Sequence, residues 1–175
     1  MISVPTQPCR CCFALQRESS RVQLMAGEQT LLSRDFPLGV DALVRQSLRH
    51  EPPWPIELEH AIELTEDAVM PLAAQFAGGA GLILQGHGAA LVAGMHEAGG
   101  VVQTVLSLDA VELLFNRLVA VSQGRPASQE TLPTDAHSFA AVLILREFMH
   151  HLRFAEVTLQ TVAAASRGIG LRSPE

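Results

Sequence analysis

The sequence has no run of about 18 uncharged apolar residues, so it offers no membrane span. Its N-terminus, MISVPTQPCRCC, has no basic segment followed by an apolar run, and we therefore expect no signal peptide and a cytoplasmic location. Charged residues make up only 17% of the chain, and the net charge is −6. A nucleic-acid backbone normally meets a basic face, which this acidic chain lacks. We expect neither a membrane nor a nucleic acid as a partner.

Common signatures of catalysis and of metal binding are also missing. There is no Walker A lysine, no G-x-S-x-G motif and no H-E-x-x-H spacing. The three cysteines, Cys9, Cys11 and Cys12, form one cluster, whereas zinc usually takes four ligands, and a histidine would have to complete the set from a distant part of the sequence. We expect reduced thiols and no metal site, with zinc binding or redox sensing at this cluster as the less favoured alternative.

What the chain does contain is enough apolar residue for one ordinary domain. Hydrophobic residues make up 48% of its 175 residues, which argues against disorder and allows a sizeable core. We expect a flexible tail over residues 1–10, a single domain over 11–170 and a loose C-terminus over 171–175. No internal repeat or low-complexity segment interrupts the domain.

The first part of the domain has the pattern of strands followed by helices. Residues 11–17, 20–26 and 29–36 read as three short strands joined by tight turns, which predicts an antiparallel ribbon. Helical spacing follows in VDALVRQSL and in IELEHAIELTEDAVM. Pro71 is expected to kink or end the second of these helices.

The second part alternates short apolar runs with longer helical patterns. GLILQ is typical of a buried strand, and AALVAGMHEA after it is typical of a helix. Ser107 is suited to cap the helix LDAVELLFNRLVAVS, and Thr134 or Asp135 to cap a long helix ending near HHLRF. EVTLQTV reads as the last strand.

The resulting order is β-β-β-α-α-β-α-α-α-β, which predicts an α/β fold. Tight turns make the first three strands antiparallel, whereas helical crossovers make the two later strands parallel additions. We therefore expect a mixed five-stranded sheet with helices on both faces, the ribonuclease H-like layout of actin-like ATPases, kinases and phosphatases.

One long segment, RVQLMAGEQTLLSRDFPLGVDALVRQSLRHEPPWPIELEHAIELTEDAVMPLA, resembles the second half of the exopolyphosphatase / guanosine pentaphosphate phosphohydrolase family. The most specific piece is Phe36-Pro37-Leu38-Gly39, which is similar to the family's "slPlG" segment. SLDAVELLFNRLVAVSQGRPASQETLP and FAAVLILREFMHHLRFAEVTL resemble the helix, loop and final strand further on, so the resemblance covers roughly residues 12–170. It implies the C-terminal actin-like half of these phosphatases.

The phosphate loops that the resemblance implies are degenerate. FALQRESSRV stands where the family has "DIGGGSTEL", with Ala14 in place of the acidic residue and Gln16, Arg17 and Glu18 in place of the three glycines. LQGHGAAL replaces "GvGGTattla", with His87 at the threonine position, and AHS at 136–138 replaces "RAD". A carboxylate for Mg²⁺ and backbone access to phosphate are thereby lost. The resemblance does not include the family's other half, which carries the catalytic acid, so we expect no catalytic residue. We also expect no cofactor, except that Mg²⁺ would be needed if the protein were an enzyme of this kind.

Two segments are candidate anion-binding sites. The first loop offers Arg17, Ser19 and Ser20, and a solvated hairpin turn is the favoured alternative there. Gly86, His87 and Gly88 follow a buried strand, where open sheets place ligands. Close packing of strand against helix is the favoured alternative for these glycines.

Three functions are left open. The favoured one is a non-catalytic interaction or regulatory module, a homodimer or a subunit whose protein partner covers an apolar cleft face. The second is a phosphatase-like hydrolase of polyphosphate or guanosine pentaphosphate, completed by a second subunit, with Glu18 as the only local carboxylate and His87 as a possible acid or base. The third is a sensor that binds a phosphate-containing small molecule without turning it over.

Overall fold

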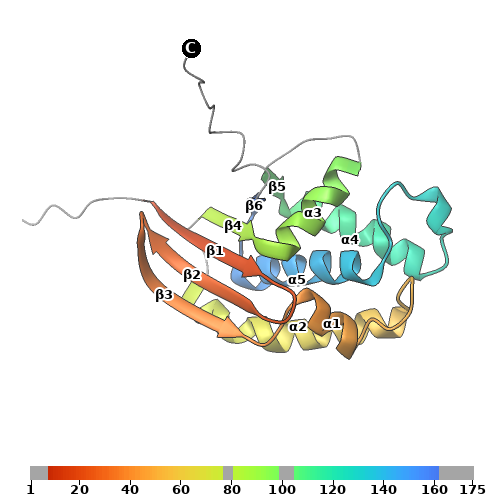
Figure 1. Cartoon of the computed structure of the whole chain (residues 1–175), viewed down its shortest axis with the longest axis horizontal. Helices are drawn as coiled ribbons and strands as arrows, with labels where there is room; N and C mark the ends of the chain where they lie inside the picture. Colours follow the sequence, from red (N-terminus) through yellow and green to blue (C-terminus); the bar gives the residue numbers. More distant parts are fainter. Residues whose placement is uncertain (1–7, 77–80, 99–104, 162–175) are drawn as a thin grey trace, which may run out of the picture.

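The structure is a computed structural model, and it describes residues 8–76, 81–98 and 105–161. Its centre is one six-stranded sheet with the strand order β3-β2-β1-β4-β6-β5 (Figure 1). The strands are β1 (Cys9–Leu15), β2 (Ser20–Ala26), β3 (Gln29–Phe36), β4 (Gly81–Gln85), β5 (Val105–Ser107) and β6 (Glu156–Leu159). The pairs β1/β2, β2/β3 and β5/β6 are antiparallel, whereas β1/β4 and β4/β6 are parallel.

Five α-helices pack with this sheet. They are α1 (Val40–Gln46), α2 (Pro55–Phe76), α3 (Gly86–Ala98), α4 (Leu108–Ser122) and α5 (Ala136–Leu152), with a short 3-10 helix at Ala127–Gln129. Helix α5 is the central one, because it packs against α1, α2, α3 and α4. In Figure 1 the blue α5 lies between the yellow α2 and the green α3 and α4.

The core joins the sheet to α5. The rings of Phe13 on β1 and Phe148 on α5 stack with their centroids 4.0 Å apart, and both side chains are fully buried. Phe36 and Phe154 extend this aromatic row at 6.1 Å on either side. The nearly continuous apolar run FAAVLIL explains why α5 is buried around most of its circumference.

The expected α/β class and its mixed sheet are confirmed, but the expected number of five strands is wrong. The sixth strand is β5, whose three residues pair antiparallel with β6. A three-residue strand that runs directly into a helix has too few alternations to be recognised by periodicity. The structure also shows β1 beginning at Cys9, two residues before the predicted strand.

Two helices begin at side chains that cap their first N–H groups. Ser107 accepts a hydrogen bond from the Ala110 N–H, and Asp135 accepts one from the Ser138 N–H, so both predicted caps are present. Pro71 lies inside α2 and does not end it, since the helix continues to Phe76. Residues 1–7 of the predicted tail 1–10 and the predicted C-terminus 171–175 lie outside the described residues, and the domain boundaries stay predictions. None of the described helices is both long and apolar enough to cross a membrane.

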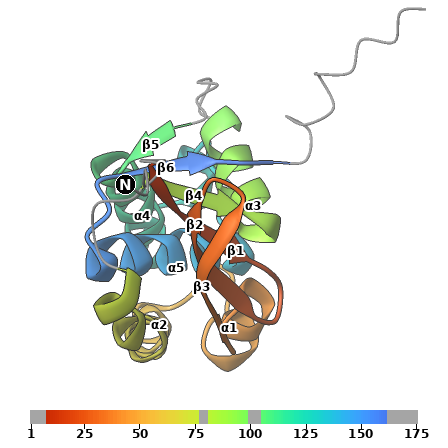
Figure 2. The same cartoon turned by 90° about the vertical axis from the view of Figure 1, so that its left-hand side faces the viewer.

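Figure 2 shows the sheet from its β3 side, with the N-terminal ribbon of β1, β2 and β3 in front. Strands β3 and β5 form the two edges of the sheet. Most residues of β3 are exposed, and Phe36 at its end is the one buried residue of this strand. The ribbon therefore presents an open edge on this side of the described structure.

Candidate functional site

The candidate site lies where the β1–β2 turn meets the start of α1. The carbonyl oxygen of Gln16 accepts the Val40 N–H at 3.0 Å, and that of Arg17 accepts the N–H groups of Asp41 and Ala42 at 2.8 and 3.2 Å. Backbone carbonyls of the turn thus satisfy the first N–H groups of the helix, which otherwise have no partner within it.

The side chains of the turn are also engaged. Ser20 is buried, and its Oγ donates to the Leu38 carbonyl oxygen at 2.6 Å. Arg17 pairs with Asp41 at 3.2 Å between Nη1 and Oδ2. Ser19 is exposed, and its carbonyl oxygen accepts the Gln16 N–H at 3.3 Å. The three predicted anion ligands therefore lie close together, but two of them already have partners within the chain.

Glu18 is paired with an arginine of α1. Both of its carboxylate oxygens accept hydrogen bonds from Arg45, at 2.8 and 2.6 Å, on the exposed side of α1. These hydrogen bonds lower the pKa of Glu18 and keep it ionised. The carboxylate that the sequence suggested for catalysis is consequently part of a surface ion pair.

The second predicted segment, Gly86-His87-Gly88, forms the first turn of α3, whereas the predicted helix began only at Ala89. Gly86 has a φ of +81°, and a Cβ atom on it would lie 2.7 Å from Nε2 of Gln16. A Cβ atom on Gly88 would lie 2.3 Å from Cδ2 of Leu15. The glycines thus allow α3 to pack closely on the end of β1.

Four polar side chains from four segments meet at this end of the molecule, and we call them the polar cluster: Arg17, Asp41, His87 and His137. Arg17 comes from the turn, and the others come from the first turns of α1, α3 and α5. Nε2 of His137 lies 3.6 Å from Oδ1 of Asp41. Neither Asp41 nor a role for His137 was predicted from the sequence.

The charges of the polar cluster act on His87. Burial lowers the pKa of His87, and the positive charge of Arg17 lowers it further, while Asp41 has the opposite effect. A neutral imidazole beside a carboxylate is a possible proton acceptor in chemical terms. Oδ1 of Asp41 is buried and makes no hydrogen bond, and the ring of His137 is 3.6 Å from it.

A shallow pocket of about 320 Å³ adjoins the turn, and its lining includes Ser19, Ser20 and Arg21. Arg21 is not free for an anion there, because it makes two hydrogen bonds to Asp35, at 2.6 and 3.0 Å. No group with three potential metal ligands occurs around the turn within the described residues. The described group of that kind is Glu66, Glu147 and His151, on α2 and α5.

The architecture defines the class of the protein. The sheet begins with an antiparallel ribbon of three strands, β1 to β3. Strand β1 of this ribbon pairs in parallel with β4, and helices pack on the sheet. This arrangement is the ribonuclease H-like, actin-like α/β fold. The polar cluster lies at the ends of β1 and β4, where open α/β sheets place their ligands.

Among the solved structures that this chain resembles are Ppx/GppA phosphatases. An Aquifex aeolicus Ppx/GppA phosphatase, the type II variant, superposes with a TM-score of 0.69 at 12% identity, covering 91% of this chain and 55% of its own. A second structure of the Aquifex aeolicus family member gives 0.69 at 12% identity, covering 96% and 60%. An exopolyphosphatase from Cytophaga hutchinsonii gives 0.63 at 16% identity, covering 89% and 55%.

These likenesses show a shared fold. The chain spans about 55–60% of the length of these neighbours, so their fold is matched over little more than half of each. In sequence, no protein-family model and no curated protein matches the chain.

Proposed function

We propose that this domain is a non-catalytic interaction or regulatory module built on the C-terminal actin-like half of an exopolyphosphatase-like fold. The observation that carries the proposal is that most polar groups of the β1–β2 turn are used within the chain. Arg17 is paired with Asp41, the Ser20 hydroxyl is bound to Leu38, and the turn carbonyls are bound to α1. In this proposal the two phosphate loops are degenerate.

The second loop supports the same proposal. A phosphate loop needs backbone N–H groups that an anion can approach, and here the side chain of Gln16 lies against Gly86. Phosphoryl transfer also depends on positive charge placed around the transferred group. The polar cluster instead contains the carboxylate of Asp41 next to its one arginine.

A module of this kind acts by binding, so the proposal includes a cytoplasmic protein partner, either a second copy of the chain or another protein. Six large apolar side chains of the described structure are between 44% and 65% exposed: Leu31, Trp54, Ile56, Met70, Val105 and Leu113. Strand β3 also offers an open sheet edge, which another strand can extend.

The test combines calorimetric titration and phosphate release on the same samples, with Mg²⁺ and GTP, guanosine pentaphosphate or short polyphosphate as ligands. The proposal expects neither heat of binding nor release, and association of the chain in sedimentation velocity experiments. Release that disappears in Asp41→Asn would establish the hydrolase instead. The matched control is Asp109→Asn, which removes a carboxylate from the first turn of α4, remote in sequence from the turn.

A second candidate is a sensor that binds a phosphate-containing molecule without turnover. It is favoured by Arg17, whose side chain is 63% exposed and is held by a single carboxylate. A multiply charged anion can compete with Asp41 for this guanidinium. The sensor predicts binding without release, lost in Arg17→Gln and retained in Arg45→Gln, because Arg45 pairs with Glu18 on the exposed side of α1.

A further inference from the structure

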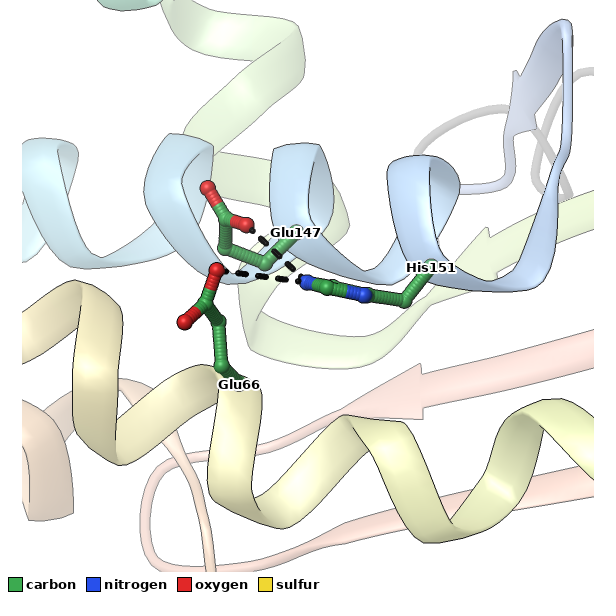
Figure 3. Close-up of side chains that lie close together, drawn as sticks. All are labelled: Glu66, Glu147 and His151. Carbon is green, nitrogen blue, oxygen red and sulfur yellow. Dashed lines mark ion pairs between the residues drawn. The ribbon is translucent and has the colours of Figure 1, made fainter.

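Away from the polar cluster, a second constellation lies between α2 and α5. It consists of Glu66 on α2 and of Glu147 and His151 on α5, whose oxygen and nitrogen atoms all lie within 4.8 Å of one another. Figure 3 shows the three side chains turned toward a common point, with Nε2 of His151 facing both carboxylates. Glu147 and His151 are four residues apart, which places them on the same face of the helix.

The distances within this constellation fit a shared metal ion better than direct hydrogen bonds. Nε2 of His151 lies 3.4 Å from Oε1 of Glu66 and 3.5 Å from Oε2 of Glu147. Hydrogen bonds between such groups are shorter, at about 2.7–3.2 Å. Around a tetrahedral Zn²⁺ with bonds of about 2.0–2.2 Å, neighbouring ligand atoms are separated by about 3.3–3.5 Å. The two measured separations correspond to edges of such a tetrahedron.

The surroundings orient the ligands and leave them accessible. Glu147 is only 4% exposed, and its Oε1 accepts a hydrogen bond from Nη1 of Arg146, so that Oε2 is left to face His151. Arg146 is itself held over the ring of Phe115, at 4.9 Å from the ring centroid. An open pocket of about 260 Å³ is lined by Glu66, Glu147 and His151, and it gives solvent a path to the site.

The local charge also favours a cation. Arg146 lies against the carboxylates of Glu112 and Glu147, and Glu66 lines the same pocket, so three carboxylates and one guanidinium give a formal charge of −2 before the histidines are counted. One divalent ion would neutralise this charge. His150 is not part of the constellation, because its Nε2 is bound to Glu112 at 2.6 Å.

We propose that Glu66, Glu147 and His151 bind a divalent transition-metal ion of the Zn²⁺ class, with water from the pocket as the fourth ligand. An imidazole together with carboxylates suits Zn²⁺ and its neighbours, whereas Mg²⁺ and Ca²⁺ prefer oxygen ligands throughout. The ion would join α2 to α5 and stabilise the folded domain, because it binds the assembled site and not the unfolded chain. This site is independent of the function proposed above.

The test uses the full chain with Co²⁺ and Zn²⁺. We expect one equivalent of Co²⁺ to give the d–d absorption of a tetrahedral site, and Zn²⁺ to displace it. Glu66→Gln and His151→Gln should each lower the Zn²⁺ affinity at least tenfold in calorimetry, since even outer-shell changes cost metal sites that much. Zn²⁺ should raise the melting temperature of the native sequence, and Mg²⁺ at the same concentration should not.

Two controls make the result specific. His150→Gln removes the neighbouring imidazole, and Cys9→Ser removes the exposed thiol, and both should retain the full Zn²⁺ affinity. Glu66 is 40% exposed, so its replacement should leave the fold intact even if replacement of the buried Glu147 does not. The proposal is overturned if no Zn²⁺ binds, if Glu66→Gln and His151→Gln bind as the native sequence does, or if the affinity is lost with Cys9.

Discussion

The backbone of Gly39 lies against the backbone of Arg17, so closely that a Cβ atom on Gly39 would be 2.4 Å from the Arg17 carbonyl oxygen. That carbonyl accepts the N–H groups of Asp41 and Ala42, so it cannot move without breaking the start of α1. The φ of Gly39 is −138°, which any residue can adopt. The glycine in the Pro-Leu-Gly segment is therefore required by space and not by backbone conformation.

Replacing Gly39 by alanine should destabilise the domain by about 1–3 kcal/mol, the usual cost of forcing an atom into a packed site. Urea denaturation would measure this as a lower midpoint. The matched control is Gly94→Ala, because Gly94 lies inside α3 with nothing within 4 Å of its added Cβ atom. That change should stabilise by up to about 1 kcal/mol through helix propensity. Equal effects at the two glycines would contradict the close contact with Arg17.

Much of the fold could be predicted from the sequence because its signals are local. The ribbon of β1–β3 follows from short strands with turn residues between them, and the helices after Ser107 and Asp135 follow from caps and apolar spacing. β5 could not be found, because a three-residue strand is specified by its pairing with β6. The start of α3 was also misplaced, since Gly86 and Gly88 normally argue against a helix and are needed here for close packing.

The candidate site was predicted only in part, for a physical reason. Arg17 and His87 were found because they stand in loops that resemble phosphate loops. Asp41 and His137 occupy the first turns of helices, where an acidic residue such as Asp41 has a purely local explanation in the helix dipole and nothing in the local sequence marks a lone histidine. Only the topology, which brings the starts of α1, α3 and α5 together, makes them neighbours of Arg17.

The charges of the polar cluster should be visible in the titration of His87. Its pKa is lowered by burial first and by the charge of Arg17 second, and it is raised by Asp41. Arg17→Gln should therefore raise the pKa of His87, and Asp41→Asn should lower it further. Following the imidazole signals by NMR against pH measures both shifts. Arg45→Gln is the control and should leave His87 unchanged, because Arg45 is paired with Glu18.

The same shift predicts a pH effect on stability. Because the folded-state pKa of His87 lies below the unfolded value of about 6.5, the unfolded chain binds the proton more readily. The stability that His87 contributes is fully present above the unfolded value and is lost as the pH falls from there through the lower folded value. His87→Gln should reduce the loss of stability between about pH 7 and pH 5 in denaturation experiments. An unchanged pH profile would show that His87 titrates as a solvated side chain.

Glu57 should make the start of α2 sensitive to acid. Burial alone would raise the pKa of Glu57, but hydrogen bonds from the N–H groups of Trp54, Arg49 and His50 and from the His50 ring lower it. Its stabilising contribution is thus present above the unfolded value of about 4.3 and is lost as the pH falls toward the lower folded value.

Glu57→Gln should consequently cost about 1–2 kcal/mol at pH 7, the value of hydrogen bonds to a charged group, and flatten the acid limb of the stability profile. Denaturant titrations at a series of pH values would measure both effects. The control is Glu59→Gln on the exposed face of the same helix, which should change the stability by less than about 0.5 kcal/mol. If the stability of Glu57→Gln fell at low pH as steeply as that of the native sequence, other carboxylates would be responsible for the acid sensitivity.

The three cysteines are free thiols, and they should differ sharply in reactivity because β1 places them differently. Cys11 is fully buried, and burial first and Cys12 second raise the pKa of its thiol to about 12. Only the thiolate reacts, and at pH 8 roughly one Cys11 in 10⁴ is ionised. Cys9, at the start of the strand, is exposed.

Alkylation with iodoacetamide, followed by peptide mass spectrometry, should therefore label Cys9 first and leave Cys11 unmodified in the native protein. In guanidinium chloride all three cysteines should react at similar rates, which controls for the chemistry of the reagent. Burial also raises the pKa of Cys12, so we expect its labelling to be intermediate. Labelling of Cys11 as fast as Cys9 under native conditions would mean that β1 separates from β2 and β4, because both partners pair with the strand at Cys11.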